Sequence, residues 1–187
     1  DLVIEAVFEN EELKAKITKM AEAVLDKDAV FGSNTSTLPI TGLAEASERP
    51  ENFIGIHFFS PVERMGLVEI ISGEKTSEAT LAKAVDYVLA IRKTPIAVND
   101  SRGFYTSRCF GTYTREGMEM LAEGIKPAII ENVGRQSGMP MGPLEVSDSV
   151  GLDTALKVTR ATAEAAGIDL QTDDRTQFLA WLVEDQE

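Results

Sequence analysis

The stretch from Gly55 to Gly73 reads G-I-H-F-F-S-P-V-E-R-M-G-L-V-E-I-I-S-G and holds two strand-like runs separated by a polar loop. The first run, 53–59, is apolar except for His57, the only histidine of the chain. The second run, 67–71, is apolar except for Glu69. Short apolar runs rich in β-branched and aromatic residues predict buried strands. The chain is therefore organised around two neighbouring strands that each carry one ionisable side chain.

A lone histidine is structural about twice as often as it is functional. The carboxylate of Glu69 on the adjacent strand shifts that balance. A carboxylate that holds an imidazole fixes its tautomer and places its pKa near neutrality, as a general base requires. We therefore consider His57 and Glu69 as a candidate base and its orienting partner.

The chain has 187 residues, 43% of them hydrophobic, and a formal net charge of −13 from 18 basic and 31 acidic residues. This is enough apolar material for one sizeable core or two small ones. An acidic chain without a basic block argues against nucleic acid or an anionic membrane as the main partner. A phosphate-bearing ligand remains open, because helix N-termini and a few local cations bind phosphate.

No run reaches the roughly eighteen apolar residues that a membrane span needs, so we expect none. The single cysteine, Cys109, excludes an internal disulfide and fits a reducing compartment. With one histidine and one cysteine we expect no metal site. We also expect Cys109 to be a buried apolar residue, Met118 and Met120 to lie in a core or interface, and Trp181 to serve packing. The acidic stretch 169–187 is expected to be a solvated surface.

The chain opens on 1–7, an apolar run typical of a strand buried on both faces, without an initiator Met or a signal peptide. Since natural domains rarely begin inside a core strand, we expect a piece of a longer polypeptide. The run 29–32 predicts a second strand and 11–25 a helix between the two, which makes a βαβ unit. A short helix at 40–46, a helix at 77–91 capped by Ser77 and a strand at 94–98 complete an α/β domain over 1–99.

Beyond the linker 99–103 the strand signal disappears, and we expect an all-α domain over 100–187. Its expected helices span 104–122, 126–138, 142–150 and 152–166.

The polar run 33–37, S-N-T-S-T, follows the strand 29–32 directly. Ligands of open α/β sheets bind at the carboxyl ends of the strands, so these side chains are candidates for a cleft. They are equally good candidates for capping the short helix at 40–46. The two interpretations do not exclude each other.

Several motifs fall in the order and spacing of one family: Val7–Asn10, Ser33–Ser36, His57–Pro61 with Glu69, Gly103–Tyr105 and Pro140–Pro143. The chain resembles the L-3-hydroxyacyl-CoA dehydrogenases of fatty-acid β-oxidation. The stretch Gly103–Arg108 looks most like the dehydrogenase part of a multifunctional fatty-acid oxidation complex α-subunit. The resemblance implies the C-terminal half of a Rossmann-type NAD-binding domain, followed by a helical 3-hydroxyacyl-CoA dehydrogenase C-terminal domain.

The same resemblance implies reversible NAD-dependent oxidation of an L-3-hydroxyacyl-CoA to a 3-ketoacyl-CoA. The implied partners are the acyl-CoA substrate and either a second copy of the protein or a thiolase-containing β-oxidation complex. The implied location is the bacterial cytoplasm, favoured over the mitochondrial matrix. Three sets of residues carry over by position: the catalytic residues His57, Glu69 and Ser36; the cofactor contacts Val7, Phe8, Glu9, Lys14, Ser36 and Ser60; and the substrate contacts Asn34, Ser36 and Ser107.

The chain departs from the family at Ser107 and Ser60, where Asn is usual, and at Arg102, where Pro is usual. No G-x-G-x-x-G occurs in the 187 residues, and in the family that motif lies upstream of Asp1. This leaves three interpretations. The chain is part of an active NAD-dependent dehydrogenase, a catalytically idle substrate-binding and dimerisation module of the larger enzyme, or a related dehydrogenase of a sugar or small hydroxy acid.

Overall fold

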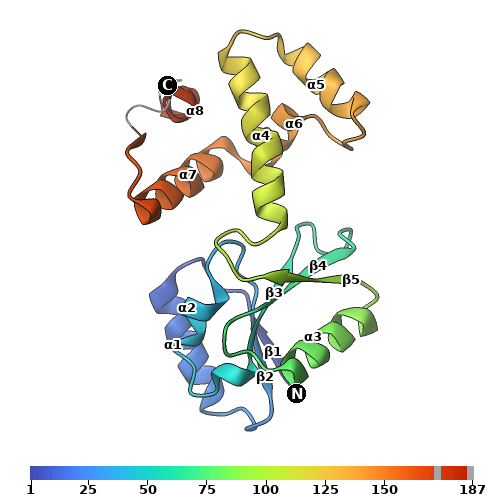
Figure 1. Ribbon diagram of the computed structural model, residues 1–187, viewed down its shortest axis with the longest axis vertical. Coiled ribbons are helices and arrows are strands. Elements are labelled where there is room, and N and C mark those ends of the chain that lie inside the picture. The colour runs from blue at the N-terminus through green and yellow to red at the C-terminus, as the bar shows by residue number, and fades with distance from the viewer. Residues whose placement is uncertain (171–173, 185–187) are drawn as a thin grey trace. The chain divides into compact units, whose positions relative to one another are not determined.

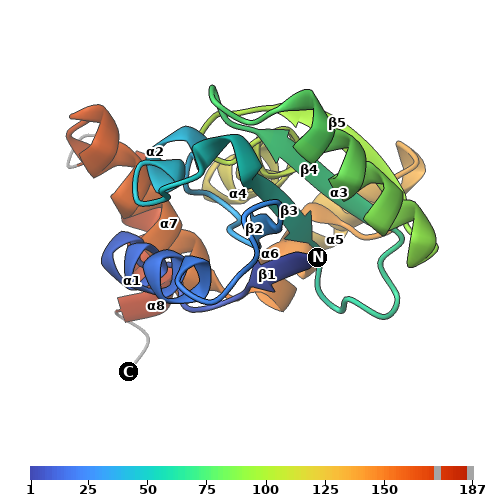
Figure 2. The ribbon, with the colours of Figure 1, turned by 90° about the horizontal axis from the view of Figure 1, so that it is seen from below.

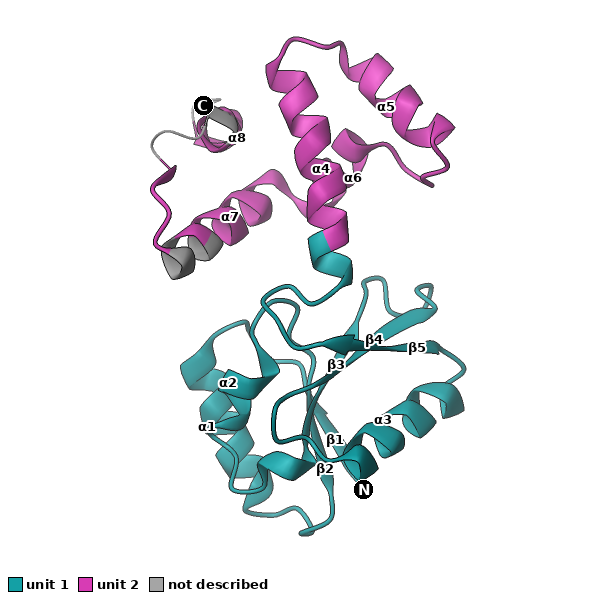
Figure 3. Ribbon diagram, viewed as in Figure 1, with its two compact units in different colours: residues 1–108 teal, residues 109–187 magenta. Residues whose placement is uncertain are grey.

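The computed structural model describes residues 1–170 and 174–184 (Figure 1). The chain forms two compact units, Asp1–Arg108 and Cys109–Glu187 (Figure 3). The helix that follows the predicted linker at 99–103 begins in the last residues of the first unit.

The first unit is built on one five-stranded sheet. Its strands, in spatial order, are β1 (Leu2–Glu5), β2 (Val30–Ser33), β3 (Phe53–Phe58), β4 (Leu67–Ser72) and β5 (Thr94–Asn99). The pairs β1–β2, β2–β3 and β4–β5 are parallel, whereas β3 and β4 are antiparallel. The carboxyl ends of β1, β2 and β3 therefore meet at one edge of the sheet, where open α/β sheets bind ligands.

Helices cover both faces of this sheet (Figures 1 and 2). The helices α1 (Glu11–Glu22) and α2 (Ile40–Ala44) lie on one face and α3 (Glu78–Ala90) on the other, with a short 3₁₀ turn at Pro50–Asn52. Asn10 caps α1 by accepting from the Leu13 amide at 2.8 Å. Ser77 caps α3 by accepting from the Thr80 amide at 3.2 Å, which confirms the predicted cap.

Each face of the sheet buries its own hydrophobic core. The core under α1 and α2 consists of Phe31, Leu38, Ile40, Leu43, Ala44, Phe53, Ile71 and Phe104. The core under α3 consists of Val30, Ile54, Ile56, Val68, Ile70, Ala84 and Val88. Helix α2 approaches the sheet closely because Gly55 has no side chain. A Cβ at Gly55 would lie 2.7 Å from the Ile40 Cδ1 atom.

Two expectations for this unit need correction. The first strand, expected to be buried on both faces, is half-buried over Leu2–Ile4, where it pairs with β2. The first helix ends at Glu22 instead of residue 25. Beyond it the Val24 amide donates to the Ala21 carbonyl at 3.1 Å, and Leu25 turns inward to pack on the core under α1.

The second unit contains only helices in its described residues, which confirms the predicted order of α/β followed by all-α. These are α4 (Thr106–Ala122), α5 (Pro127–Gln136), α6 (Pro143–Val150), α7 (Leu152–Ala166) and α8 (Asp174–Glu184). Pro127 and Pro143 are the first residues of α5 and α6. Proline has no amide hydrogen, and at this position the amide has no partner within the helix. Helix α8 was not predicted, since the acidic stretch 169–187 was expected to be a solvated surface. Residues 171–173 and 185–187 of that stretch lie outside the described residues.

Single residues of the second unit differ from their expected environment. Cys109 is exposed, so the prediction of a buried thiol is wrong. The reason is that α4 turns most of its surface outward, with Gly117 as its only fully buried residue. Met118 and Met120 are half-buried. The rings of Trp181 and Phe178 stack at 5.9 Å. Over residues 1–170 and 174–184, no helix has the length and apolar character of a membrane crossing.

Candidate active site

His57 and Glu69 form a buried pair across two strands. The antiparallel register of β3 and β4 places the two residues directly opposite each other. Opposite residues of an antiparallel pair project from the same face of the sheet, within side-chain reach. The His57 Nδ1 atom lies 2.7 Å from the Glu69 Oε2 atom. His57 is 5% exposed and Glu69 is fully buried, so the structure brings this predicted pair together in a site shielded from water.

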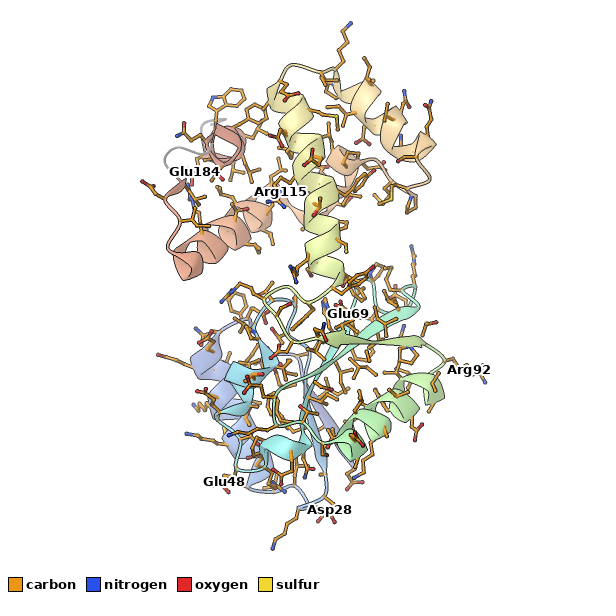
Figure 4. All side chains as sticks on the ribbon, viewed as in Figure 1. Asp28, Glu48, Glu69, Arg92, Arg115 and Glu184 are labelled. Atoms are coloured by element: carbon orange, nitrogen blue, oxygen red, sulfur yellow. The ribbon has the colours of Figure 1, made fainter. Side chains whose placement is uncertain are left out.

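The second oxygen of Glu69 holds the start of α4. Glu69 Oε1 accepts from the Thr106 amide at 2.8 Å and the Tyr105 amide at 3.1 Å, and Figure 4 labels Glu69 among the surrounding side chains. Burial alone would raise the pKa of the Glu69 carboxyl. The hydrogen bonds from His57 and Thr106 outweigh burial, and the pKa of Glu69 stays below its ordinary value. Glu69 is therefore a carboxylate at neutral pH.

Because Glu69 is ionised, it can only accept a hydrogen bond from His57. The Nδ1 atom of His57 then carries the proton, and Nε2 is the basic nitrogen. The ring of Phe59 lies 4.5 Å from the imidazole, centroid to centroid, and that of Phe104 lies 6.0 Å away. Phe104 has a φ of 47°, which is uncommon for an aromatic residue. Such a backbone costs on the order of 1–3 kcal/mol and is typical of functional sites.

Ser36 lies on an exposed turn whose donors converge on one carboxylate. Glu9 Oε1 accepts from the Thr35 hydroxyl at 2.7 Å, the Ser36 amide at 3.0 Å and the Thr37 amide at 3.1 Å. Burial raises the pKa of Glu9, but the hydrogen bond from Thr35 and the charge of Lys14 outweigh it and lower the pKa. An ionised Glu9 therefore gathers the donors of three consecutive residues around Ser36.

Asn34 connects the Ser36 turn to the histidine strand. Its Oδ1 atom accepts from the Phe58 amide at 2.9 Å, one residue beyond His57. This hydrogen bond holds the carboxyl end of β2 next to the carboxyl end of β3. The predicted substrate contacts Asn34 and Ser36 thus share one edge of the sheet with the buried pair.

The alternative that the run 33–37 caps α2 is wrong. The first amides of α2, at Ile40 and Thr41, donate to the carboxylate of Asp100 at 2.8 Å each. The hydroxyl of Thr35 accepts from the Leu38 amide at 3.0 Å, before the helix begins. A residue 60 positions away in the chain takes the capping role, and local sequence carries no signal for it.

The predicted cofactor contacts occupy different environments. Phe8 is 83% exposed, and Ser60 is exposed just beyond β3. Lys14 is 2% exposed; its ammonium contacts the carboxylate of Glu5 at 2.9 Å and the Val7 carbonyl at 3.3 Å. The predicted substrate contact Ser107 is half-buried on α4.

The exposed edge fits a dinucleotide. Phe8, Ser36 and Ser60 follow β1, β2 and β3, and all three are exposed where the parallel strands end. An aromatic side chain that is 83% exposed beside hydroxyl groups offers both stacking and hydrogen bonding to a nucleotide. The aromatic ring and the hydroxyl groups at this edge are chemically suited to NAD, the predicted cofactor.

Sequence reasoning missed three residues that shape the site. Thr35 was read only as part of a polar run, although its buried hydroxyl donates to Glu9. Phe104 was noted as part of a motif, without its contact to His57. Glu5 was passed over, although a carboxylate inside an apolar strand is itself a signal, because such a charge must find a buried partner.

Comparisons with known proteins cover nearly the whole chain. A family model described as 3-hydroxyacyl-CoA dehydrogenase, NAD binding domain, matches residues 1–101. A second model, described as 3-hydroxyacyl-CoA dehydrogenase, C-terminal domain, matches residues 103–186. The curated fatty acid oxidation complex subunit alpha of Shewanella loihica is 42% identical over 184 residues, which are 94% of the chain and 26% of that relative. The chain therefore spans about a quarter of the length of the curated relatives it matches.

Solved structures show the same similarity. The (S)-3-hydroxybutyryl-CoA dehydrogenase of Ralstonia eutropha matches with a TM-score of 0.88 and 35% identity, over 99% of this chain and 65% of that one. The 3-hydroxybutyryl-CoA dehydrogenase of Escherichia coli K12 matches with a TM-score of 0.83 and 32% identity, over 90% of this chain and 36% of that one.

Proposed function

The chain belongs to the 3-hydroxyacyl-CoA dehydrogenase family, and from this premise we propose that it takes part in the reversible NAD-dependent oxidation of an L-3-hydroxyacyl-CoA to a 3-ketoacyl-CoA. The observation that carries the proposal is the buried contact of 2.7 Å between His57 Nδ1 and Glu69 Oε2. It leaves the Nε2 atom of His57 basic, and oxidation of a secondary alcohol needs a base for the hydroxyl proton.

In this proposal His57 Nε2 takes the proton of the substrate 3-hydroxyl. Glu69 stabilises the resulting imidazolium, since its carboxylate is 2.7 Å from Nδ1 and shielded from water. Bound NAD⁺ supplies the acceptor for the hydride that leaves C3. In the reverse direction the imidazolium returns its proton to the alkoxide oxygen. Glu69 keeps the ring in one tautomer through both directions.

Ser36 and Asn34 would orient the substrate oxygen beside His57. Ser36 is exposed on its turn, and its amide is fixed by Glu9 at 3.0 Å, so its hydroxyl is free to face a ligand. Asn34 is held by the Phe58 amide through its oxygen, which leaves its amide hydrogens as donors. Ser107 stands where the family usually has Asn. Its shorter side chain would contact the substrate from α4. Correct placement of reacting groups supplies a large part of the rate of such reactions.

The direct test is His57→Gln in the full-length protein. Turnover of a 3-hydroxyacyl-CoA should fall by at least about a hundredfold, because the base is lost, while acyl-CoA binding is largely kept. The matched control is Asp86→Asn, an exposed change on α3, which should keep normal turnover. Near-normal turnover of His57→Gln would remove His57 from the role of base.

A second candidate is a catalytically idle module that binds substrate or a second copy within the larger enzyme. In this candidate the full-length protein binds an acyl-CoA but does not oxidise it. A turnover assay of the full-length protein with a 3-hydroxyacyl-CoA and NAD⁺ separates the two. Turnover supports the dehydrogenase, and acyl-CoA binding without turnover supports the idle module.

The relatives suggest where such an enzyme works. The curated relatives carry the name of a subunit of a fatty acid oxidation complex and come from bacteria. On this ground we propose an acyl-CoA substrate, a bacterial cytoplasmic location, and a second copy or a thiolase-containing complex as partner. Copurification with thiolase activity from the native organism would test the last point.

A further inference from the structure

The first turn of α4 contains a buried hydroxyl without a partner. The Oγ1 atom of Thr106 is shielded from water, and in the described parts of the chain it is the only buried side-chain nitrogen or oxygen that makes no hydrogen bond. A buried hydroxyl without a partner has given up its hydrogen bonds to water and gained none in return. Such a group calls for a physical explanation.

Thr106 lies directly beside the carboxylate that orients His57. Its amide donates to Glu69 Oε1 at 2.8 Å, and the Tyr105 amide donates to the same atom at 3.1 Å. The other oxygen, Glu69 Oε2, lies 2.7 Å from His57 Nδ1. Glu69 thus forms its ion pair with His57 of β3, whereas α4 turns neutral donors toward it. The hydroxyl without a partner therefore sits beside the oxygen of Glu69 that does not face the imidazole.

Two other threonines of the first unit show how a carboxylate holds such a residue. The amide and the hydroxyl of Thr41 both donate to Asp100 Oδ2, at 2.8 and 2.6 Å. The amide and the hydroxyl of Thr37 both donate to Glu9 Oε1, at 3.1 and 3.2 Å. In both cases one carboxylate oxygen accepts from the backbone and from the side chain of the same threonine.

Thr106 has only half of this arrangement. Its amide donates to Glu69, but its hydroxyl is not in hydrogen-bond geometry. Rotation about the Cα–Cβ bond moves the hydroxyl between staggered positions while the amide stays in place. The hydroxyl is already near enough to act on the carboxyl. Burial raises the pKa of Glu69, and the hydrogen bond from His57, the amide of Thr106 and the hydroxyl of Thr106 lower it.

We propose that Thr106 is a positioning residue, whose hydroxyl turns onto Glu69 Oε1 as a third donor and thereby limits the negative charge that Glu69 presents to His57. This assignment rests on the proposed function, in which His57 is the base. A hydrogen bond to one oxygen of a carboxylate draws charge away from the other oxygen. Thr106 therefore acts through Glu69 and touches neither the substrate nor the cofactor.

The test is Thr106→Val in the full-length protein, because valine has nearly the same shape without the hydroxyl. Loss of the donor leaves more negative charge on Glu69, which favours the imidazolium. In a plot of kcat/KM for a 3-hydroxyacyl-CoA against pH, the midpoint of the acidic limb should move up by at least about half a pH unit. Thr106→Ser keeps the hydroxyl and should keep the wild-type midpoint.

Two results of this experiment would overturn the proposal. One is an acidic limb of Thr106→Val that coincides with that of the wild type. The other is a raised KM with an unmoved limb, which would place the hydroxyl on the substrate. If Thr106→Val does not fold, Thr106→Ala removes the same hydroxyl and should show the same upward shift.

The matched control is Thr41→Val, which removes the equivalent hydroxyl from Asp100 at the start of α2. It should lower stability in urea and leave the acidic limb in place, because Asp100 has no contact with His57 among the described residues. Equal shifts of the limb in Thr41→Val and Thr106→Val would assign the shift to general damage. A Thr106→Val protein that is more stable than wild type and has an unmoved limb would mark the hydroxyl as idle. Either result would contradict the proposal.

A readout without turnover separates this inference from the proposed function. Histidine labelled at the imidazole carbon gives a resonance for His57 in the full-length protein, identified by its loss in His57→Gln. Its titration midpoint should rise in Thr106→Val by the same amount as the acidic limb. A raised midpoint, together with normal turnover of His57→Gln, would uphold the role of Thr106 and reject the proposed base. Coincident midpoints in wild type, Thr106→Val and Thr106→Ser would overturn the role of Thr106 alone.

Discussion

The His57–Glu69 pair and the Ser36 turn lie at the same edge of one sheet but are held in different ways. His57 and Glu69 lie directly opposite each other on two hydrogen-bonded strands. The second oxygen of Glu69 accepts hydrogen bonds from two further backbone amides. The turn lies beyond the end of β2. The Oε1 atom of Glu9 accepts hydrogen bonds from its Thr35 hydroxyl and its Ser36 amide. The proposed base is thus placed mainly by the backbone, and the proposed substrate contact mainly by a side chain.

This difference indicates which substitutions should disturb each part. A sheet register cannot change without breaking several hydrogen bonds at once, so the position of the pair tolerates most single substitutions. A turn whose donors converge on one carboxylate is sensitive to the charge and position of that group. We expect changes at the pair to act on the chemistry itself, and changes at the turn to act on geometry.

The largest effect is expected for Glu69→Gln, which breaks the pair but keeps its shape. The amide oxygen can still accept from Tyr105 and Thr106, but the amide nitrogen then faces His57 and favours the wrong tautomer. Turnover should fall by about a hundredfold and by no more than in His57→Gln, because Glu69 acts through His57. Steady-state kinetics measures this, with Asp86→Asn on the opposite face of the sheet as control. A loss below tenfold would mean that the sheet alone orients His57.

A smaller effect is expected for Thr35→Val, which weakens the turn without touching the pair. The change removes the donor at 2.7 Å to Glu9 and leaves the Leu38 amide without its acceptor at 3.0 Å. The free energy of unfolding should fall by about 1–3 kcal/mol, and turnover by about tenfold. Urea unfolding and kinetics check the two numbers.

Thr35→Ser is the matched control, because it keeps the hydroxyl and should stay close to wild type. Equal losses in Thr35→Ser and Thr35→Val would show that the hydroxyl hydrogen bonds are not the cause of the effect.

The smallest effect is expected in the pH dependence of stability. The pKa of Glu9 is lowered in the folded chain: burial opposes this, but the hydrogen bond from Thr35 and the charge of Lys14 prevail. A carboxylate with a lowered folded pKa stabilises the protein above its unfolded value of about 4.3. That contribution disappears as the pH falls through the folded value.

Urea unfolding at a series of acidic pH values should therefore show wild-type stability falling more steeply below about pH 4.3 than that of Glu9→Gln. Thr35→Val should lie between the two, because it removes only one of the hydrogen bonds that lower the pKa. Parallel curves for all three proteins would contradict a charge-dependent turn.

Most of the fold was predictable from the sequence, because local patterns decide it. The apolar runs around His57 and Glu69 became β3 and β4, and Ser77 caps α3 as predicted. The motifs around Ser36 and His57 also identified the family, which the family models confirm. What failed depends on packing: the half-buried β1, the exposed Cys109 and the helix α8.

The sequence by itself determined which residues are available for chemistry, because it specifies the type and order of the side chains. These are one histidine, a carboxylate on the next strand and a serine after β2. Only the tertiary structure decided how these groups are held. Asp100 caps α2 from 60 residues away, Glu69 meets the amide of Thr106, and the buried Lys14 stands between Glu5 and Glu9. The physical reason is that a buried charge takes whichever partner the fold brings within hydrogen-bond distance, and distance along the chain does not reveal that partner.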